Sequence, residues 1–272
     1  MIRKAAVAGS WYPGTRPALV AAVERHLAAT GRDLAGDLIA LVSPHAGLMY
    51  SGPVAAHAYR LLRGRTFDLV VLVGPSHFVG FDGVAVVADG GFETPLGAAA
   101  IDAEVARALV DATPVVSDDA GPHAREHSLE MQLPFVQHLA PDARIVPLLM
   151  GYQTDATARA LGAALAAVLK GRRALVIAST DLSHYHDADT ATKMDRVVID
   201  CVERFDADAL QAALTARPDH ACGGGPTVAV MRAARLLGAR DAVVLDYADS
   251  GDVSGDKSAV VGYLAAALGT FA

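Results

Sequence analysis

The sequence predicts an α/β fold in which a central mixed, partly parallel sheet is flanked by helices, as a single layered domain over residues 1–272. Short apolar runs rich in β-branched residues alternate along the chain with Ala-rich segments of helical spacing. No internal repeat, low-complexity linker or shift in composition marks a domain boundary. With 53% hydrophobic and 19% charged residues, the chain can bury one large core.

The predicted elements follow one another in an alternating order. Buried strands are expected at Leu38–Val42, Leu69–Val73, Arg144–Leu149, Ala174–Ala178 and Ala242–Leu245. Helices are expected at Pro17–Ala29, Ala100–Val110, Asp155–Leu169 and Thr227–Leu237. A strand followed by a helix and another strand is typical of parallel pairing, because the helix carries the chain back along the sheet.

The charge pattern argues against nucleic acids and membranes as partners. The formal net charge is −7, and the basic residues are scattered without interleaved aromatic residues. The apolar segment at residues 260–272 is too short to span a bilayer, and the first apolar stretch is too short for a signal peptide.

The cysteine content indicates a reducing compartment. Only Cys201 and Cys222 occur, which is not a disulfide framework, so we expect a cytoplasmic protein. Cys201 lies in a predicted helical stretch beside Val202, where a small buried side chain is the expected role.

A histidine follows three of the predicted strands within a few residues. His45 comes after Leu38–Val42, His77 after Leu69–Val73, and His184 after Ala174–Ala178. In α/β sheets the loops after the strands converge on a crevice where ligands bind. The three histidines are therefore expected near one another.

His45, His77 and Cys222 are the predicted metal ligands. Each of the two histidines follows a proline in a strand-exit turn, which restricts the backbone and so the direction of the side chain. Cys222 precedes three glycines and a predicted helix, whose N-terminus is expected to lower the thiol pKa and favour a thiolate. The alternative for each residue alone is an ordinary hydrogen-bonded histidine or a small buried cysteine.

Asp181 and His184 are three residues apart in one strand-exit loop, which suits an acid/base histidine held by a carboxylate. The alternative is that Asp181 caps the following segment. We expect His186 to be exposed.

A separate pattern suggests a different chemistry. His123, Glu126 and His127 form H-x-x-E-H, the inverted zinc-peptidase motif, in which a glutamate base lies between two zinc-binding histidines on one helix face. Such a short pattern arises easily by chance, so a zinc hydrolase is an alternative here.

Read in order, several segments together resemble the Memo family, called AmmeMemoRadiSam system protein B in prokaryotes. They span nearly the whole chain: Ala8–Tyr12, Pro44–Gly47, Tyr50–Gly52, Gly74–His77, Glu126–Glu130, Ser179–His184, Ala221–Gly223, Tyr247 and Val260–Tyr263. The resemblance implies a fold similar to the class III extradiol dioxygenases, whose non-haem iron is held by two histidines and a carboxylate.

Residue by residue, the resemblance implies metal ligands at His45 and His77, with Cys222 in place of the carboxylate. His184 corresponds to the acid/base histidine of the dioxygenases, with Asp181 and His127 nearby. The cysteine departs from the dioxygenase triad, which argues against ring cleavage.

These observations predict a metal-binding protein that acts as a dioxygenase-like oxidoreductase on a small-molecule or peptide-borne substrate. The expected cofactor is a divalent metal, Fe(II) first, although a cysteine ligand also suits copper or zinc. The alternatives are a non-catalytic peptide- or protein-binding module with a vestigial metal site, and the zinc hydrolase. The resemblance also implies partner proteins of the same system.

Overall fold

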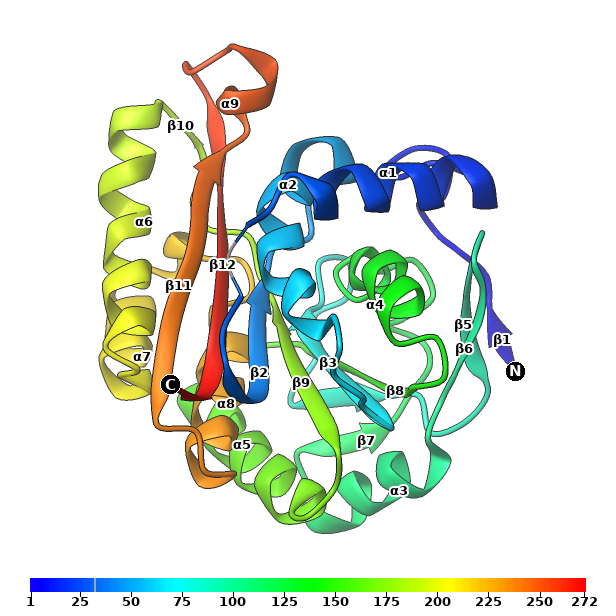
Figure 1. The fold of residues 1–272 in the computed structure, drawn as a ribbon. Coiled ribbons are helices and arrows are strands. Elements are labelled where there is room, and N and C mark those ends of the chain that lie inside the picture. The colour runs from blue at the N-terminus through cyan, green and yellow to red at the C-terminus, as the bar shows by residue number, and fades with distance from the viewer. Residues whose placement is uncertain (32) are drawn as a thin grey trace.

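A mixed β-sheet forms the centre of the computed structural model, which describes residues 1–31 and 33–272 (Figure 1). Within these residues the sheet has nine strands, in the order β10-β12-β2-β9-β3-β8-β4-β7, with β11 paired to β12. The strands are β2 (Gly36–Ser43), β3 (Leu69–Pro75), β4 (Val84–Val86), β7 (Val116–Asp118), β8 (Arg144–Met150), β9 (Ala174–Ser179), β10 (His184–His186), β11 (Asp241–Asp249) and β12 (Val260–Phe271).

The four central strands are parallel, and antiparallel strands extend the sheet on both sides. Strands β2, β9, β3 and β8 pair in parallel, with Val71 opposite both Val146 and Val176. Strand β12 runs antiparallel to β2, and β4 antiparallel to β8. Every residue of β3 is buried, as expected for a parallel strand covered on both faces. The predicted α/β class with a partly parallel central sheet is confirmed.

Helices cover both faces of the sheet (Figure 1). Their bounds are α1 (Arg16–Ala28), α2 (Leu48–Tyr59), α3 (Ala103–Ala112), α4 (Leu133–Leu139), α5 (Asp155–Leu169), α6 (Ala188–Glu203), α7 (Ala207–Ala216), α8 (Gly224–Leu236) and α9 (Gly251–Ser254). Helix α8 packs on β9, β3 and β2 and against α5, while α2 packs on β12 and β2 and against α1. No helix in the described part of the chain is long and apolar enough to cross a membrane.

Shorter elements complete the fold. Strands β1 (Ile2–Arg3), β5 (Gly91–Thr94) and β6 (Gly97–Ala100) form a second small sheet. Helical turns cover η1 (Arg60–Leu62), η2 (Glu130–Gln132) and η3 (Pro218–His220). The helix predicted from Ala100 begins at Ala103, because Asp102 caps it by accepting the Val105 N–H at 3.0 Å.

One buried carboxylate ties the N-terminal segment to the core. Glu130 has no exposed surface, and its two oxygens accept the Arg3 guanidinium at 2.6 Å, the Ala6 and Val7 N–H groups at 2.8 and 3.0 Å, and the Tyr12 hydroxyl at 2.7 Å. All of these partners are donors, so only an ionised carboxylate satisfies them together.

We expect Glu130→Gln to lower the free energy of unfolding by about 3–5 kcal/mol. The amide has a single acceptor oxygen and would turn an NH₂ group toward other donors, leaving the half-buried Arg3 charge without its carboxylate partner. Chemical denaturation by guanidinium chloride measures the change.

The matched control is Glu203→Gln, which breaks an exposed pair 3.4 Å from Arg196 and should change stability by less than about 1 kcal/mol. Equal effects of the two substitutions would contradict the role given to Glu130.

Candidate metal centre

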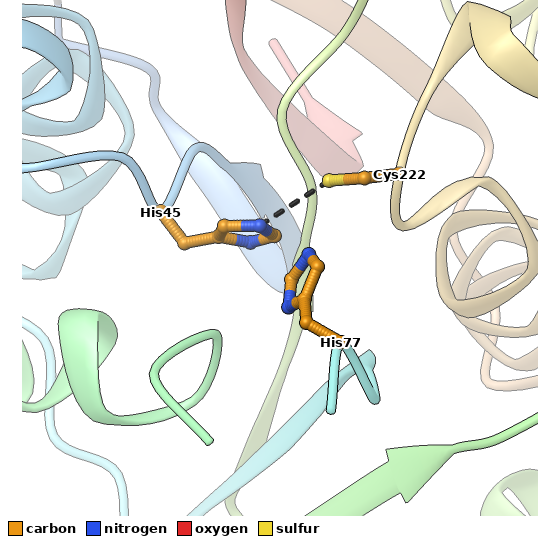
Figure 2. A group of neighbouring side chains, drawn as sticks. All are labelled: His45, His77 and Cys222. Atoms are coloured by element: carbon orange, nitrogen blue, oxygen red, sulfur yellow. Dashed lines mark hydrogen bonds between the residues drawn. The ribbon is translucent and has the colours of Figure 1, made fainter. Parts of the chain in front are cut away.

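His45, His77 and Cys222 converge at the carboxyl edge of the central strands (Figure 2). His45 follows β2, His77 follows β3, and Cys222 lies just before α8. One donor atom from each lies within 4.8 Å of the others, and the Cys222 Sγ is 3.2 Å from the His45 Nε2. The three side chains point toward one another from separate segments, as Figure 2 shows. The chain thus brings together the three residues predicted as ligands.

The hydrogen bonds around His45 determine its tautomer. The Ser179 hydroxyl lies 2.9 Å from Nδ1 of His45, 2.6 Å from the Ser128 carbonyl and 2.8 Å from the Gln132 amide nitrogen. The Gln132 nitrogen also donates to the Pro44 carbonyl at 3.0 Å, which orients the amide. Since the Ser179 hydroxyl donates its only hydrogen to Ser128, it must accept a hydrogen bond from the Nδ1–H of His45. The His45 Nε2 lone pair is left for a cation.

His77 has the same tautomer for a different reason. Its Nδ1 lies 2.8 Å from Oε1 of Glu126, and its backbone N–H donates to Oε2 at 2.6 Å. Burial raises the pKa of the Glu126 carboxyl, but hydrogen bonds from His77 and Ser128 outweigh it and bring the pKa down to about 2. An ionised carboxylate can only accept, so Nδ1 carries the proton and Nε2 is free.

The donor set fits a transition metal. Burial, followed by the neighbouring His77, holds the pKa of His45 well below its usual value, so its ring is neutral and able to coordinate. Two imidazoles and one sulfur suit iron, zinc or copper(I). A second group of possible ligands, His77, Glu126 and His127, shares His77 with the first. Its Glu126 oxygens already accept N–H groups from both histidine loops, which favours Glu126 as a support for His77.

The predicted lowering of the Cys222 thiol pKa is wrong. Burial and the Asp181 carboxylate raise this pKa well above its usual value, and α8 begins only at Gly224. Without a bound cation the thiol is therefore protonated. A side chain at Gly223 would clash with the loop after β9, because a Cβ there would lie 2.8 Å from the Thr180 Cβ.

Asp181 does not orient His184 as the sequence suggested. Its Oδ1 accepts the backbone N–H of His45 at 2.7 Å and that of Ala46 at 3.3 Å. Burial raises the Asp181 pKa to about 7. The described residues show no hydrogen bond between Asp181 and His184. Asp181 instead positions the loop that carries the first histidine.

His184 is near enough to the cluster for its charge to lower the pKa of His45. It is half-buried, and burial lowers its pKa, with a smaller contribution from His77. His186, expected to be exposed, is half-buried too. Between them Tyr185 is the extra residue of a β-bulge, since His184 and His186 pair with the adjacent residues Val261 and Val260.

The H-x-x-E-H pattern does not form a zinc-peptidase site. Residues 119–129 form turns, bends and irregular backbone instead of a helix, so His123 and His127 do not share a helix face. The His123 Nε2 lies 3.0 Å from the Ala85 carbonyl, and its ring contacts Phe92, whereas His127 stacks on His77 with ring centroids 4.5 Å apart. Burial lowers the pKa of both His123 and His127 to about 4.

Sequence reasoning missed several contributors to the site. Ser179 and Gln132 fix the His45 ring, and Trp11 and Phe78 flank His127 with ring centroids at 4.3 and 5.9 Å. The only signal for Trp11 was its place in the first segment of the family resemblance. The H-x-x-E-H pattern predicts Glu126 as a base, whereas its role as a hydrogen-bond acceptor for His77 depends on the tertiary fold.

The fold and the site together define an α/β protein with two histidines and a cysteine at the carboxyl edge of a mixed sheet. The model of the Memo-like protein family matches residues 3–267. A MEMO1 family protein from Methanopyrus kandleri is 42% identical over 97% of this chain and 98% of its own. Another, from Methanothermobacter thermautotrophicus, is 40% identical over 97% and 99%. The chain belongs to the Memo family.

A solved structure shares the fold. It is that of an uncharacterized protein from Escherichia coli K12, with a TM-score of 0.53 and 15% sequence identity. The match covers 84% of this chain and 99% of that one. At this identity the likeness concerns the fold alone.

We expect Glu126→Gln to weaken metal binding by about 10–100-fold, because the amide is a poorer acceptor for the His77 Nδ1–H. Ser179→Ala should act on His45 in the same way. Titration of each purified variant against a chromophoric chelator measures the affinity.

His123→Ala is the control, since this ring points to Ala85, and its metal affinity should equal that of the unchanged protein. If His123→Ala lowered the metal affinity and Glu126→Gln did not, the role of Glu126 in orienting His77 would be contradicted.

Proposed function

We propose that this protein is a metal-dependent oxidoreductase in which His45, His77 and Cys222 hold a divalent metal, Fe(II) in the first place. The convergence of the three donors, with Nδ1 of each histidine engaged in a hydrogen bond so that Nε2 can coordinate, is the observation that carries the proposal. Two histidines and one anionic ligand leave positions open on iron, as in non-haem oxygenases. A bound redox-active metal would supply electron transfer and polarise a substrate oxygen.

The surrounding side chains have separate tasks in this proposal. His184 is the proton-transfer residue, because its half-buried ring has a lowered pKa and can accept a proton at neutral pH. His127, neutral and stacked on His77, is the second candidate. Asp181 positions the His45 loop and with it the first ligand.

The substrate in this proposal is a small molecule or a group borne on a peptide. Both cysteines are free, which is consistent with the reducing cytoplasm that we propose as its location. From the family resemblance we also propose that this protein has partner proteins of the AmmeMemoRadiSam system.

A second candidate is a non-catalytic module that binds a peptide or a protein. The exposed rings of Trp11, Phe78 and Tyr185 beside the histidines favour it, because exposed aromatic side chains are typical of binding surfaces. Turnover by the metal-loaded protein distinguishes the two.

Replacing His45 or His77 by Ala is expected to abolish stoichiometric metal while the fold remains intact, because each removes one of three donors. Elemental analysis after anaerobic purification gives the metal content, and circular dichroism reports the fold. Full metal content in both variants would refute the ligand set.

His184→Gln should keep the metal, since His184 belongs to neither group of possible ligands in the described residues. Oxygen uptake by the iron-loaded protein should fall by about 10²–10⁴. Loss of metal in this variant would make His184 a ligand, and unchanged uptake would remove its role in proton transfer.

A further inference from the structure

Two residues other than glycine have a left-handed backbone in the described part of the chain. They are Tyr185, with a φ of 62°, and Phe205, with a φ of 54°. A Cβ makes this conformation unfavourable, and glycine adopts it without that cost. Each aromatic side chain at such a position therefore calls for a compensating interaction.

Phe205 has such a compensation. Its side chain is only 6% exposed, and the Arg235 guanidinium lies 3.9 Å from the centre of its ring. The backbone closes the end of α6, since the Phe205 N–H donates to the Val202 carbonyl at 2.8 Å and the Asp206 N–H to the Cys201 carbonyl at 2.9 Å. Burial and capping offset the unfavourable backbone.

Tyr185 lacks this compensation. It is 78% exposed, and its hydroxyl has no hydrogen-bond partner among the described residues. It is the extra residue of the bulge in β10, where glycine would keep the same backbone at lower cost. The ring therefore contributes little to the stability of the fold.

The position of the Tyr185 ring, beside a histidine of the candidate site, indicates its role. Its centroid lies 5.7 Å from that of His184. Trp11 and Phe78, which are 38% and 52% exposed, flank His127 from two other loops. Three exposed rings on separate segments thus each adjoin a histidine of the candidate site.

We infer that Tyr185 is a substrate-contacting residue of the metal centre and stacks on a planar apolar group of the substrate. The left-handed bulge holds the ring in solvent beside His184, where an incoming group can cover it. This inference rests on the proposed function and specifies the kind of group that the site accepts.

The test uses indole, which is planar and apolar, and compares the metal-loaded protein with Tyr185→Phe and Tyr185→Gly. Saturation-transfer NMR measures indole binding. We expect Tyr185→Phe to bind within about twofold of the unchanged protein and Tyr185→Gly to bind about three- to tenfold more weakly. The melting temperature of Tyr185→Gly should be unchanged or higher, because the strain is relieved.

Phe205→Gly is the matched control at the other left-handed residue. It should melt at a lower temperature, because the buried ring is lost, and bind indole like the unchanged protein. Equal indole affinity of Tyr185→Gly and the unchanged protein, no saturable binding to the latter, or a lower melting temperature of Tyr185→Gly would each overturn the inference. Metal content is measured in the same samples, so a protein that holds no metal refutes the proposed function instead.

Discussion

The candidate centre depends on the hydrogen bonds that the buried Glu126 carboxylate accepts. Its oxygens accept the ring and the backbone N–H of His77 and also the backbone N–H groups of His127 and Ser128. Its own carbonyl accepts the Arg3 guanidinium, which also pairs with Glu130. The loop after β3, the turns before η2 and the N-terminal segment therefore meet at one residue, and the direction of His77 follows from all three.

The elements that could be predicted from the sequence are those whose local pattern and tertiary role agree. Helix α5 has the predicted bounds, because Thr154 caps it and its apolar residues recur at helical spacing. Strand β12 was missed, since Ala265, Ala266 and Ala267 have little preference for strands and owe their conformation to pairing with β2 and β11. Helix α2 was missed because Pro53 lies inside it.

The candidate site likewise has features that the sequence predicts and features that depend on the tertiary fold. The nearness of His45 and His77 follows from the rule that loops after parallel strands converge, which needs only the order of the elements. The raised thiol pKa of Cys222 and the partner of Asp181 depend on burial and on segments far apart in the chain. No local pattern carries that information, and so both expectations failed.

The short contact between the Cys222 sulfur and the His45 Nε2 has a consequence for the proposed metal site. The protonated thiol can donate across this 3.2 Å contact, because Nε2 of the neutral His45 ring is an acceptor. A metal binds the thiolate, so a cation held by both atoms would have to displace the thiol hydrogen. Each ion bound at the proposed site would therefore release one proton, and the affinity would fall as the pH is lowered.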